Sequence, residues 1–465
     1  MNAPEHLIIS GPEDILGYVP HTLGYWPSCS LVAMTMQGKR LGATLRVDLP
    51  EGTPSPRGRE EFARTVADYL LADKEADGTL LIFFTDDGWS DAAGPPGSRA
   101  LLADLEPALG LAGMPVRDAW YVGVQYWRNV YCTDAECCPL PGRPLAEIRD
   151  SRLNAEMVYL GSSVGEAPGT GPAATAGSGD PAVMEAEGRW AHELCDGRGS
   201  REQFETVLDA WQAALAFTSA RDTARGFETA TGLQASSGCK AGPGPESEAA
   251  LPCDITGFLR ATLCVPAWRD AVLVMAAAGR ATALAGAEQF GIFSRPPGLP
   301  ARGPSLNGLG NAGLDIGGKG AAGRDTVGHG AAGLAAGEEP GVKAQCPDAG
   351  GRDGNPEPPG YGEVLLGLSP AVPDWQAMKL LEDVMLHLVA CGPGEAEAAA
   401  WTSKGWIEWC RGRGSYAHAS LSKALAAAPG YRLAELLSEV VRRGTICGWA
   451  GRKEAAWQRF GTDAA

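Results

Sequence analysis

Long apolar runs are missing from this sequence. No window of about 18 or more consecutive apolar residues occurs in its 465 residues, and a membrane-spanning helix needs about 20. The opening residues, MNAPEH, contain no basic cluster of the kind that begins a secretory signal. We therefore expect a cytoplasmic protein with no membrane-embedded part.

Basic residues are also in deficit. The chain has 39 Lys and Arg against 56 Asp and Glu, which gives a formal net charge of -17 at pH 7. Nucleic-acid binding draws much of its affinity from clustered Lys and Arg, and anionic membrane surfaces attract the same residues. This acidic composition disfavours both nucleic acids and membranes as partners.

Cysteine is sparse for the length of the chain. The 12 Cys are too dispersed to form the dense disulfide framework of a small secreted domain. We expect most of them to be reduced and buried, and treat the one cluster among them separately below.

Aromatic residues are absent from residues 294–360, where Gly, Pro and Ala dominate. Such a segment cannot bury enough apolar surface to offset its chain entropy, so we predict a disordered insertion over residues 294–362. Shorter stretches of similar composition predict a linker over residues 161–182 and a flexible excursion over residues 226–253.

The remaining residues divide into three regions. Their predicted bounds are 1–160 for an N-terminal domain, 183–293 for a helical region and 363–465 for a helical C-terminal region.

Several short sequence motifs occur in a fixed order along the chain. They are SGPEDIL (10–16), VPHTLGYWPSCSLV (19–32), RVDLP (46–50), YCTDAECCP (131–139) followed by GRPL (142–145), WRDAVL (268–273), and a C-terminal segment over 406–437 that contains PGYRLAELL. In this order they resemble an actinobacterial family of uncharacterised proteins, domain of unknown function 4192. The resemblance implies a family and no activity.

The N-terminal domain begins with a short predicted helix. Ser10 and Glu13 have capping-box spacing, with Pro12 in the first turn. Because proline lacks the amide hydrogen of a helix interior, we expect Pro20 to end or kink this helix.

The next segment predicts the order β-β-α-β-α-β. In the second strand, residues 41, 43, 45 and 47 are apolar or small and alternate with polar ones, which predicts one buried face and one wet face. The order implies an α/β sandwich on a mixed sheet, with a parallel core and an antiparallel hairpin. The predicted strands are 30–36, 41–48, 79–84, 116–124 and 126–131, and the predicted helices are 60–72 and 98–109.

The rest of the chain is predicted to be all-α. Ser200 with Gln203 repeats the capping-box spacing at the start of one helix. The C-terminal region resembles a tetratricopeptide helical hairpin, because small residues stand where two helices would cross closely. The predicted helices are 254–263, 266–278, 374–390 and 433–443, and the positions carrying the resemblance are Trp401, Gly405, Gly412, Ala417, Ala424 and Pro429.

The cysteine cluster has C-x4-C-C spacing and consists of Cys132, Cys137 and Cys138. Three thiolates could supply three of the four ligands of a tetrahedral zinc ion, with the fourth from a distant residue such as Cys29, His21, Cys195 or His192. The alternative is that all three are buried, reduced thiols without metal. We favour the thiols and expect no cofactor, with zinc as the one exception that the cluster allows.

Two further pairs are candidate ligand sites. Asp86 and Asp87 follow the predicted strand 79–84, at the carboxyl edge where open α/β sheets place ligands. Such carboxylates could hold a cation or act as acid and base, although Asp-Asp-Gly is also an ordinary turn. Arg46 and Asp48 could bind a ligand, but we expect a structural ion pair.

A G-x-S-x-G match at residues 161–165 is not expected to be catalytic. A nucleophile elbow needs a helix directly after the serine, and Pro168, Gly169 and Pro172 follow here.

Two functional hypotheses remain. The first is a noncatalytic binding or adaptor protein that contacts a protein partner through its C-terminal helices, because the tetratricopeptide-like unit is of a protein-interaction type. The alternative is an enzyme or a metal-dependent small-molecule binder, with a site near the sheet edge and the cysteine cluster.

Overall fold

The computed structural model describes residues 9–50, 52, 54–86, 88–89, 94–95, 97–169, 179–231, 250–295, 298, 300–306, 309 and 360–458. The chain forms two compact units. The first combines Met1–Gly177 with Lys404–Ala465, and the second is Ser178–Ser403.

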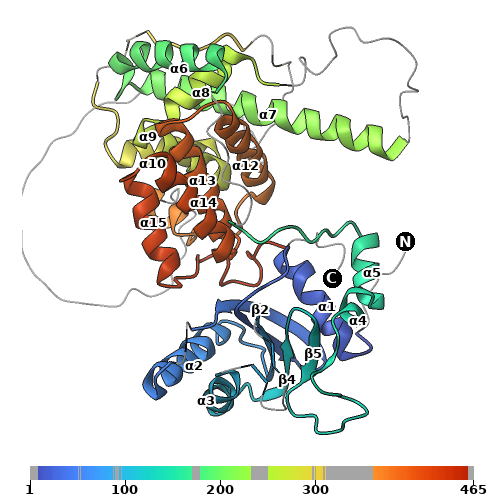
Figure 1. The fold of residues 1–465 in the computed structure, drawn as a ribbon. Coiled ribbons are helices and arrows are strands. Elements are labelled where there is room, and N and C mark those ends of the chain that lie inside the picture. The colour runs from blue at the N-terminus through green and yellow to red at the C-terminus, as the bar shows by residue number, and fades with distance from the viewer. Residues whose placement is uncertain are drawn as a thin grey trace, which may run out of the picture. The chain divides into compact units, whose positions relative to one another are not determined.

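The first unit contains a six-stranded sheet in the order β2-β1-β3-β4-β5-β6 (Figure 1). Only β3 and β4 pair in parallel, and every other neighbouring pair is antiparallel. The mixed sheet is thus confirmed, while the expected parallel core is reduced to one pair. The strands are β1 (Ser30–Gln37), β2 (Arg40–Asp48), β3 (Gly78–Phe84), β4 (Val116–Val122), β5 (Tyr126–Asn129) and β6 (Arg143–Pro144).

The path of the chain explains why the parallel core is so small. β1 and β2 form the predicted hairpin, and α2 (Pro56–Leu70) then carries the chain to β3 on the far side of β1. β1 therefore lies between two strands that are both antiparallel to it. α3 (Ser98–Leu111) makes the one crossover between parallel neighbours, from β3 to β4.

Helices cover both faces of the sheet (Figure 1). On one face, Leu81, Phe83 and Tyr121 belong to a core that includes buried residues of α2 and α3. On the other face, Ile82, Phe84 and further residues pack with α1 (Pro12–Leu23) and α4 (Ala146–Arg149). β3 is buried along its whole length, as its unbroken apolar run predicts.

The start of α1 differs from the prediction. Gly11 is the N-cap, and the Ser10 side chain makes no cap; instead the Ser10 amide donates to Asp14 Oδ2 at 2.9 Å. α1 also continues through Pro20 to Leu23, since its second half is packed into the core. The predicted Ser10 cap is therefore wrong, and of the two outcomes expected at Pro20, an end of the helix does not occur.

β2 has the two predicted faces only in part. Leu45 and Val47 pack against the core under α2 and α3. The pairing of β2 with β1 shifts in register between Met34 and Met36 of β1. Leu41, at the start of β2, packs against the core on the other face of the sheet, under α1 and α4. Such a bulge reverses the alternation, which a strict period of two cannot anticipate.

The second unit is helical and contains large aromatic core residues, among them Trp190, Trp211 and Trp268. Asp374 caps α12 by accepting from the Ala377 amide at 2.8 Å. Its helices are α6 (Pro181–Glu193), α7 (Arg201–Thr231), α8 (Cys253–Leu263), α9 (Pro266–Ala278), α10 (Arg280–Gln289), α11 (Tyr361–Leu365) and α12 (Trp375–Ala390), with a 3-10 turn at Cys195–Gly197.

Two predicted irregular segments are more ordered than expected at their edges. α7 continues through Gly226 to Thr231. The Gln203 side chain bonds both the amide and the carbonyl of Arg302, each at 2.7 Å, so a predicted insertion starting at residue 294 begins too early. Residues 232–249 and 310–359 lie outside the described residues.

Three helices end the chain: α13 (Glu395–Cys410), α14 (Gly414–Ala427) and α15 (Arg432–Arg442). α13 begins in the second unit and ends in the first. Gly405 allows a close approach to α14, because a Cβ there would lie 2.8 Å from Leu421 Cγ.

Among the described residues, no single helix is both long and apolar enough to cross a membrane. The pair α8 and α9 passes a test of length and composition together, with a bend of 106° between them.

Candidate metal centre

The cysteine cluster lies on the loop that joins β5 to β6. Asn129 ends β5, and its Oδ1 accepts hydrogen bonds from the amides of Tyr131 and Cys132 at 2.9 and 3.0 Å. Asp134 then turns the chain again, since its Oδ1 accepts from the Glu136 amide at 2.8 Å. These two Asx turns fold the loop back toward its own beginning.

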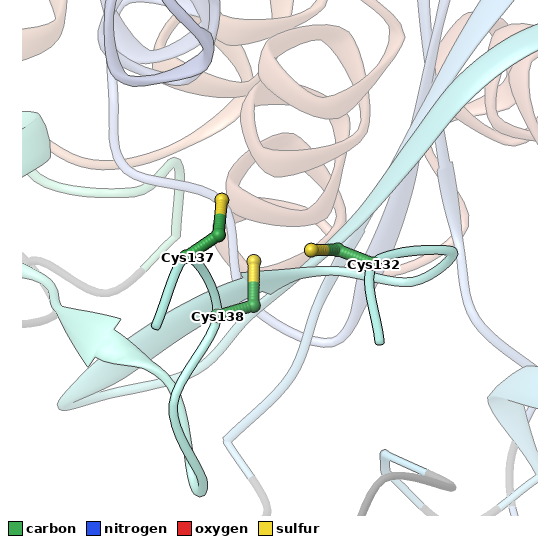
Figure 2. A group of neighbouring side chains, drawn as sticks. All are labelled: Cys132, Cys137 and Cys138. Carbon is green, nitrogen blue, oxygen red and sulfur yellow. The ribbon is translucent and has the colours of Figure 1, made fainter. Parts of the chain in front are cut away.

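The folded loop brings three sulfurs together (Figure 2). The Cys138 amide donates to the Asp134 carbonyl at 2.8 Å, and the sulfurs of Cys132, Cys137 and Cys138 all lie within 4.8 Å of one another. No carboxylate or imidazole among the described residues joins the group within that distance.

The exposure of the three thiols is unequal. Cys138 is 5% exposed, Cys132 is half-buried and Cys137 is exposed. The expectation of three buried thiols is therefore wrong for Cys132 and Cys137. The loop projects beyond the sheet, as the exposure of Leu140 at 56% also indicates.

The pKa values of two of the thiols move in opposite directions. Hydrogen bonding from the Asp134 backbone, and then from Cys138, lowers the pKa of Cys132. Burial raises the pKa of Cys138 to about 11. Cys132 therefore loses its proton before Cys138 does.

A buried cation lies beside the loop. Arg128 Nη2 donates to the Cys132 carbonyl at 3.3 Å, and the residue is 4% exposed. Its positive charge favours negative charge on the loop.

The proposed distant ligands do not complete the cluster within this unit. His21 is 1% exposed and bonds Ser162 Oγ and Asn154 Oδ1 at 2.8 and 2.7 Å. The Cys29 thiol donates to Asp86 Oδ2 at 3.4 Å. Cys195 and His192 belong to the second unit.

The hydrogen bonds of His21 were not foreseen. Asn154 Nδ2 donates to the Arg149 carbonyl at 2.6 Å, so Asn154 Oδ1 accepts from His21 Nε2, and His21 Nδ1 forms its hydrogen bond with Ser162 Oγ. Because Ser162 is 5% exposed and its amide donates to Met157, we interpret the chain of bonds as a structural link between α1 and α5 (Arg152–Tyr159). No spacing in the sequence signals it, since 141 positions separate His21 from Ser162.

Asp86 is not among the groups that lie within 4.8 Å of the three clustered sulfurs. It lines a cleft of about 260 Å³ together with Trp89, Tyr126 and the turn between β4 and β5, although Pro141 of the cysteine loop lines the same cleft. The cleft is at the turn end of this hairpin, where Val122 pairs with Trp127, whereas the cysteine loop leaves the end where Asn129 pairs with Trp120. Asp87 lies outside the described residues.

Arg46 and Asp48 form an ion pair of 2.5 Å on β2. Arg46 Nη1 also donates to Ser415 Oγ of α14 at 3.1 Å. Both interactions are structural contacts of the first unit.

A comparison with protein-family models shows to which family the chain belongs. A family model described as domain of unknown function (DUF4192) matches residues 12–287 and 370–446. The chain belongs to the DUF4192 family. The matched segments of this DUF4192 chain include Asp86, Arg128 and the cysteine loop, so these features lie in the family's domain and outside the unmatched insertion. No curated protein matches the chain, and no solved structure matches it.

Proposed function

We propose that this DUF4192 protein binds one zinc ion through Cys132, Cys137 and Cys138. The observation that carries the proposal is the convergence of three sulfurs within 4.8 Å on one loop. Three protein ligands with an exchangeable fourth position are typical of zinc sites that bind a small molecule or activate water. The exposure of Cys137 favours solvent or a small-molecule ligand as the fourth.

The charge of the surroundings supports a thiolate centre. Zinc with three thiolates carries one net negative charge, and the Arg128 guanidinium carries one positive charge at hydrogen-bond distance from the same loop. Groups around a metal that offset its ligand charge stabilise the bound state.

Metal analysis of the purified protein tests the proposal. We expect one zinc per chain, lost in the variant Cys137→Ser with Cys138→Ser, together with a lower melting temperature after chelation. Cys253→Ser is the matched control, because Cys253 is an exposed thiol outside the cluster. Substoichiometric zinc in all three proteins, with no response to chelator, would refute the zinc centre.

A second proposal is an adaptor role for the C-terminal helices. The close approach of Gly405 to Leu421 favours a hairpin of the tetratricopeptide type, and Leu436 of α15 is 47% exposed. We propose that α15 contacts a protein partner through Leu436. Leu436→Glu should abolish stoichiometric co-purification of a partner, whereas Leu111→Glu, at a leucine 92% exposed on α3, should not.

We also propose a cytoplasmic location, because reducing compartments keep exposed thiols free. Actinobacterial origin stays a prediction from the sequence resemblance.

A further inference from the structure

Two buried polar side chains with incomplete hydrogen bonding lie on the face of the sheet that α3 covers. Tyr121 of β4 and Arg128 of β5 are directly opposite each other in the antiparallel register. Because Tyr121 packs in the core under α2 and α3, the alternation of a strand directs Arg128 to the same face.

Both side chains are buried, and both have polar atoms that make no hydrogen bond to a described residue. Arg128 is 4% exposed, and within the described part of the chain its Nε and Nη1 have no hydrogen-bond partner. The Tyr121 hydroxyl, in a residue 1% exposed, also has none. One nitrogen of this guanidinium, Nη2, bonds the Cys132 carbonyl, but a buried cation with two unsatisfied nitrogens and no carboxylate bonded to it is costly, so this position favours an anion.

The N-terminus of α3 adds further positive potential. α3 is 14 residues long, begins after Gly97 and has no side-chain cap. The guanidiniums of Arg99, in its first turn, and of Arg128 both act on the Tyr121 hydroxyl, whose pKa is nevertheless raised by burial. Both guanidiniums therefore lie near the Tyr121 hydroxyl. Free amides at a helix N-terminus favour an anion.

The backbone before α3 approaches this place closely. Gly94 lies against the Tyr121 ring, since a Cβ there would be 2.2 Å from Tyr121 Cε2. The Trp89 ring is 6.2 Å from the Tyr121 ring and also lines the 260 Å³ cleft. The cleft and the unsatisfied groups thus share Trp89 as a common wall.

We propose that Arg128, Tyr121, Arg99 and the N-terminus of α3 bind the phosphate group of a phosphorylated small molecule. Two guanidiniums and a helix N-terminus match the double negative charge of a phosphate monoester better than the single charge of a carboxylate. The ring of the ligand occupies the adjacent cleft, between the aromatic residues Trp89 and Tyr126. Asp86 in the cleft disfavours a second phosphate by charge repulsion.

This site is at the carboxyl ends of the parallel strands β3 and β4, where open α/β sheets bind ligands. It shares Arg128 with the surroundings of the proposed zinc centre but uses none of the three cysteines, and the probes below contain no metal.

Binding of inorganic phosphate, adenosine monophosphate and acetate to the full chain tests the proposal at constant ionic strength. We expect the monophosphate to bind most tightly, phosphate more weakly and acetate weakest. Arg99→Gln should weaken monophosphate binding by roughly tenfold or more, which corresponds to one charge-assisted hydrogen bond. Arg64→Gln, an equal charge change on the exposed side of α2, should leave it unchanged.

Arg128→Met separates ligand binding from a structural role. Replacement of this buried and only partly hydrogen-bonded cation by an apolar residue should leave the ligand-free protein about as stable, while phosphate binding is lost. If neither phosphate compound bound at millimolar concentration, the proposal would fail. It would also fail if acetate bound as tightly as phosphate, or if both Arg99→Gln and Arg128→Met bound the monophosphate normally.

Discussion

Zinc binding at the cysteine loop should depend steeply on pH. Burial holds the pKa of Cys138 at about 11, so this thiol is protonated near neutral pH and must release its proton when the ion binds. One proton displaced per ion makes the affinity rise about tenfold per pH unit, and three protons would make it rise about a thousandfold. Between pH 6 and pH 8 we therefore expect at least a hundredfold gain in affinity.

Competition with a chromophoric chelator at fixed ionic strength measures this slope, after correction for the protonation of the chelator. Proton release in weakly buffered solution gives an independent count. Cys138→Ser should remove at least one displaced proton, while Cys253→Ser should leave the slope unchanged because Cys253 lies outside the cluster. A slope below one proton per ion in the native protein would refute thiolate ligation by Cys138.

Four further substitutions test the packing. Gly257→Ala places a Cβ 2.7 Å from the Glu187 amide nitrogen, so overpacking should lower the free energy of unfolding by about 1–3 kcal/mol. Gly188→Ala is the control, because a Cβ there meets nothing within 4 Å, and it should raise the free energy of unfolding by up to about 1 kcal/mol in denaturant unfolding. Arg260→Ala leaves its ion-pair partner Glu187 unpaired and should cost about 3–5 kcal/mol by the same assay; a loss under about 1 kcal/mol would contradict a buried ion pair. Asp14→Ala should cost about 1–3 kcal/mol, because it removes the acceptor of two backbone amides, and hydrogen exchange at the start of α1 should increase.

Local patterns predicted those elements whose stability depends on nearby residues. The unbroken apolar run of β3 and the helices 266–278 and 374–390 were predicted closely from period and caps. The capping box at Ser10 misled, because a tertiary contact decides that helix start. Asp14, one residue beyond Glu13, is held by the Leu153 amide, 139 positions away.

The candidate sites, too, were predicted only where nearby residues determine the structure. Spacing alone suggested that Cys137 and Cys138 could meet Cys132, since a loop of this length can turn back on itself. Exposure of the thiols depends on what packs against the loop, so it could not be read from spacing. The opposition of Tyr121 and Arg128 depends on the register of two strands, and neither residue attracted attention in the sequence.

The two outer strands of the sheet have a consequence for behaviour at high concentration. β6 consists only of Arg143 and Pro144, and a proline has no amide hydrogen to offer an incoming strand. β2 carries Arg46 and Asp48 and is paired across a register shift. Short, charged or irregular borders of this kind discourage one sheet from extending into another. We therefore expect this domain to resist edge-to-edge aggregation even at high concentration.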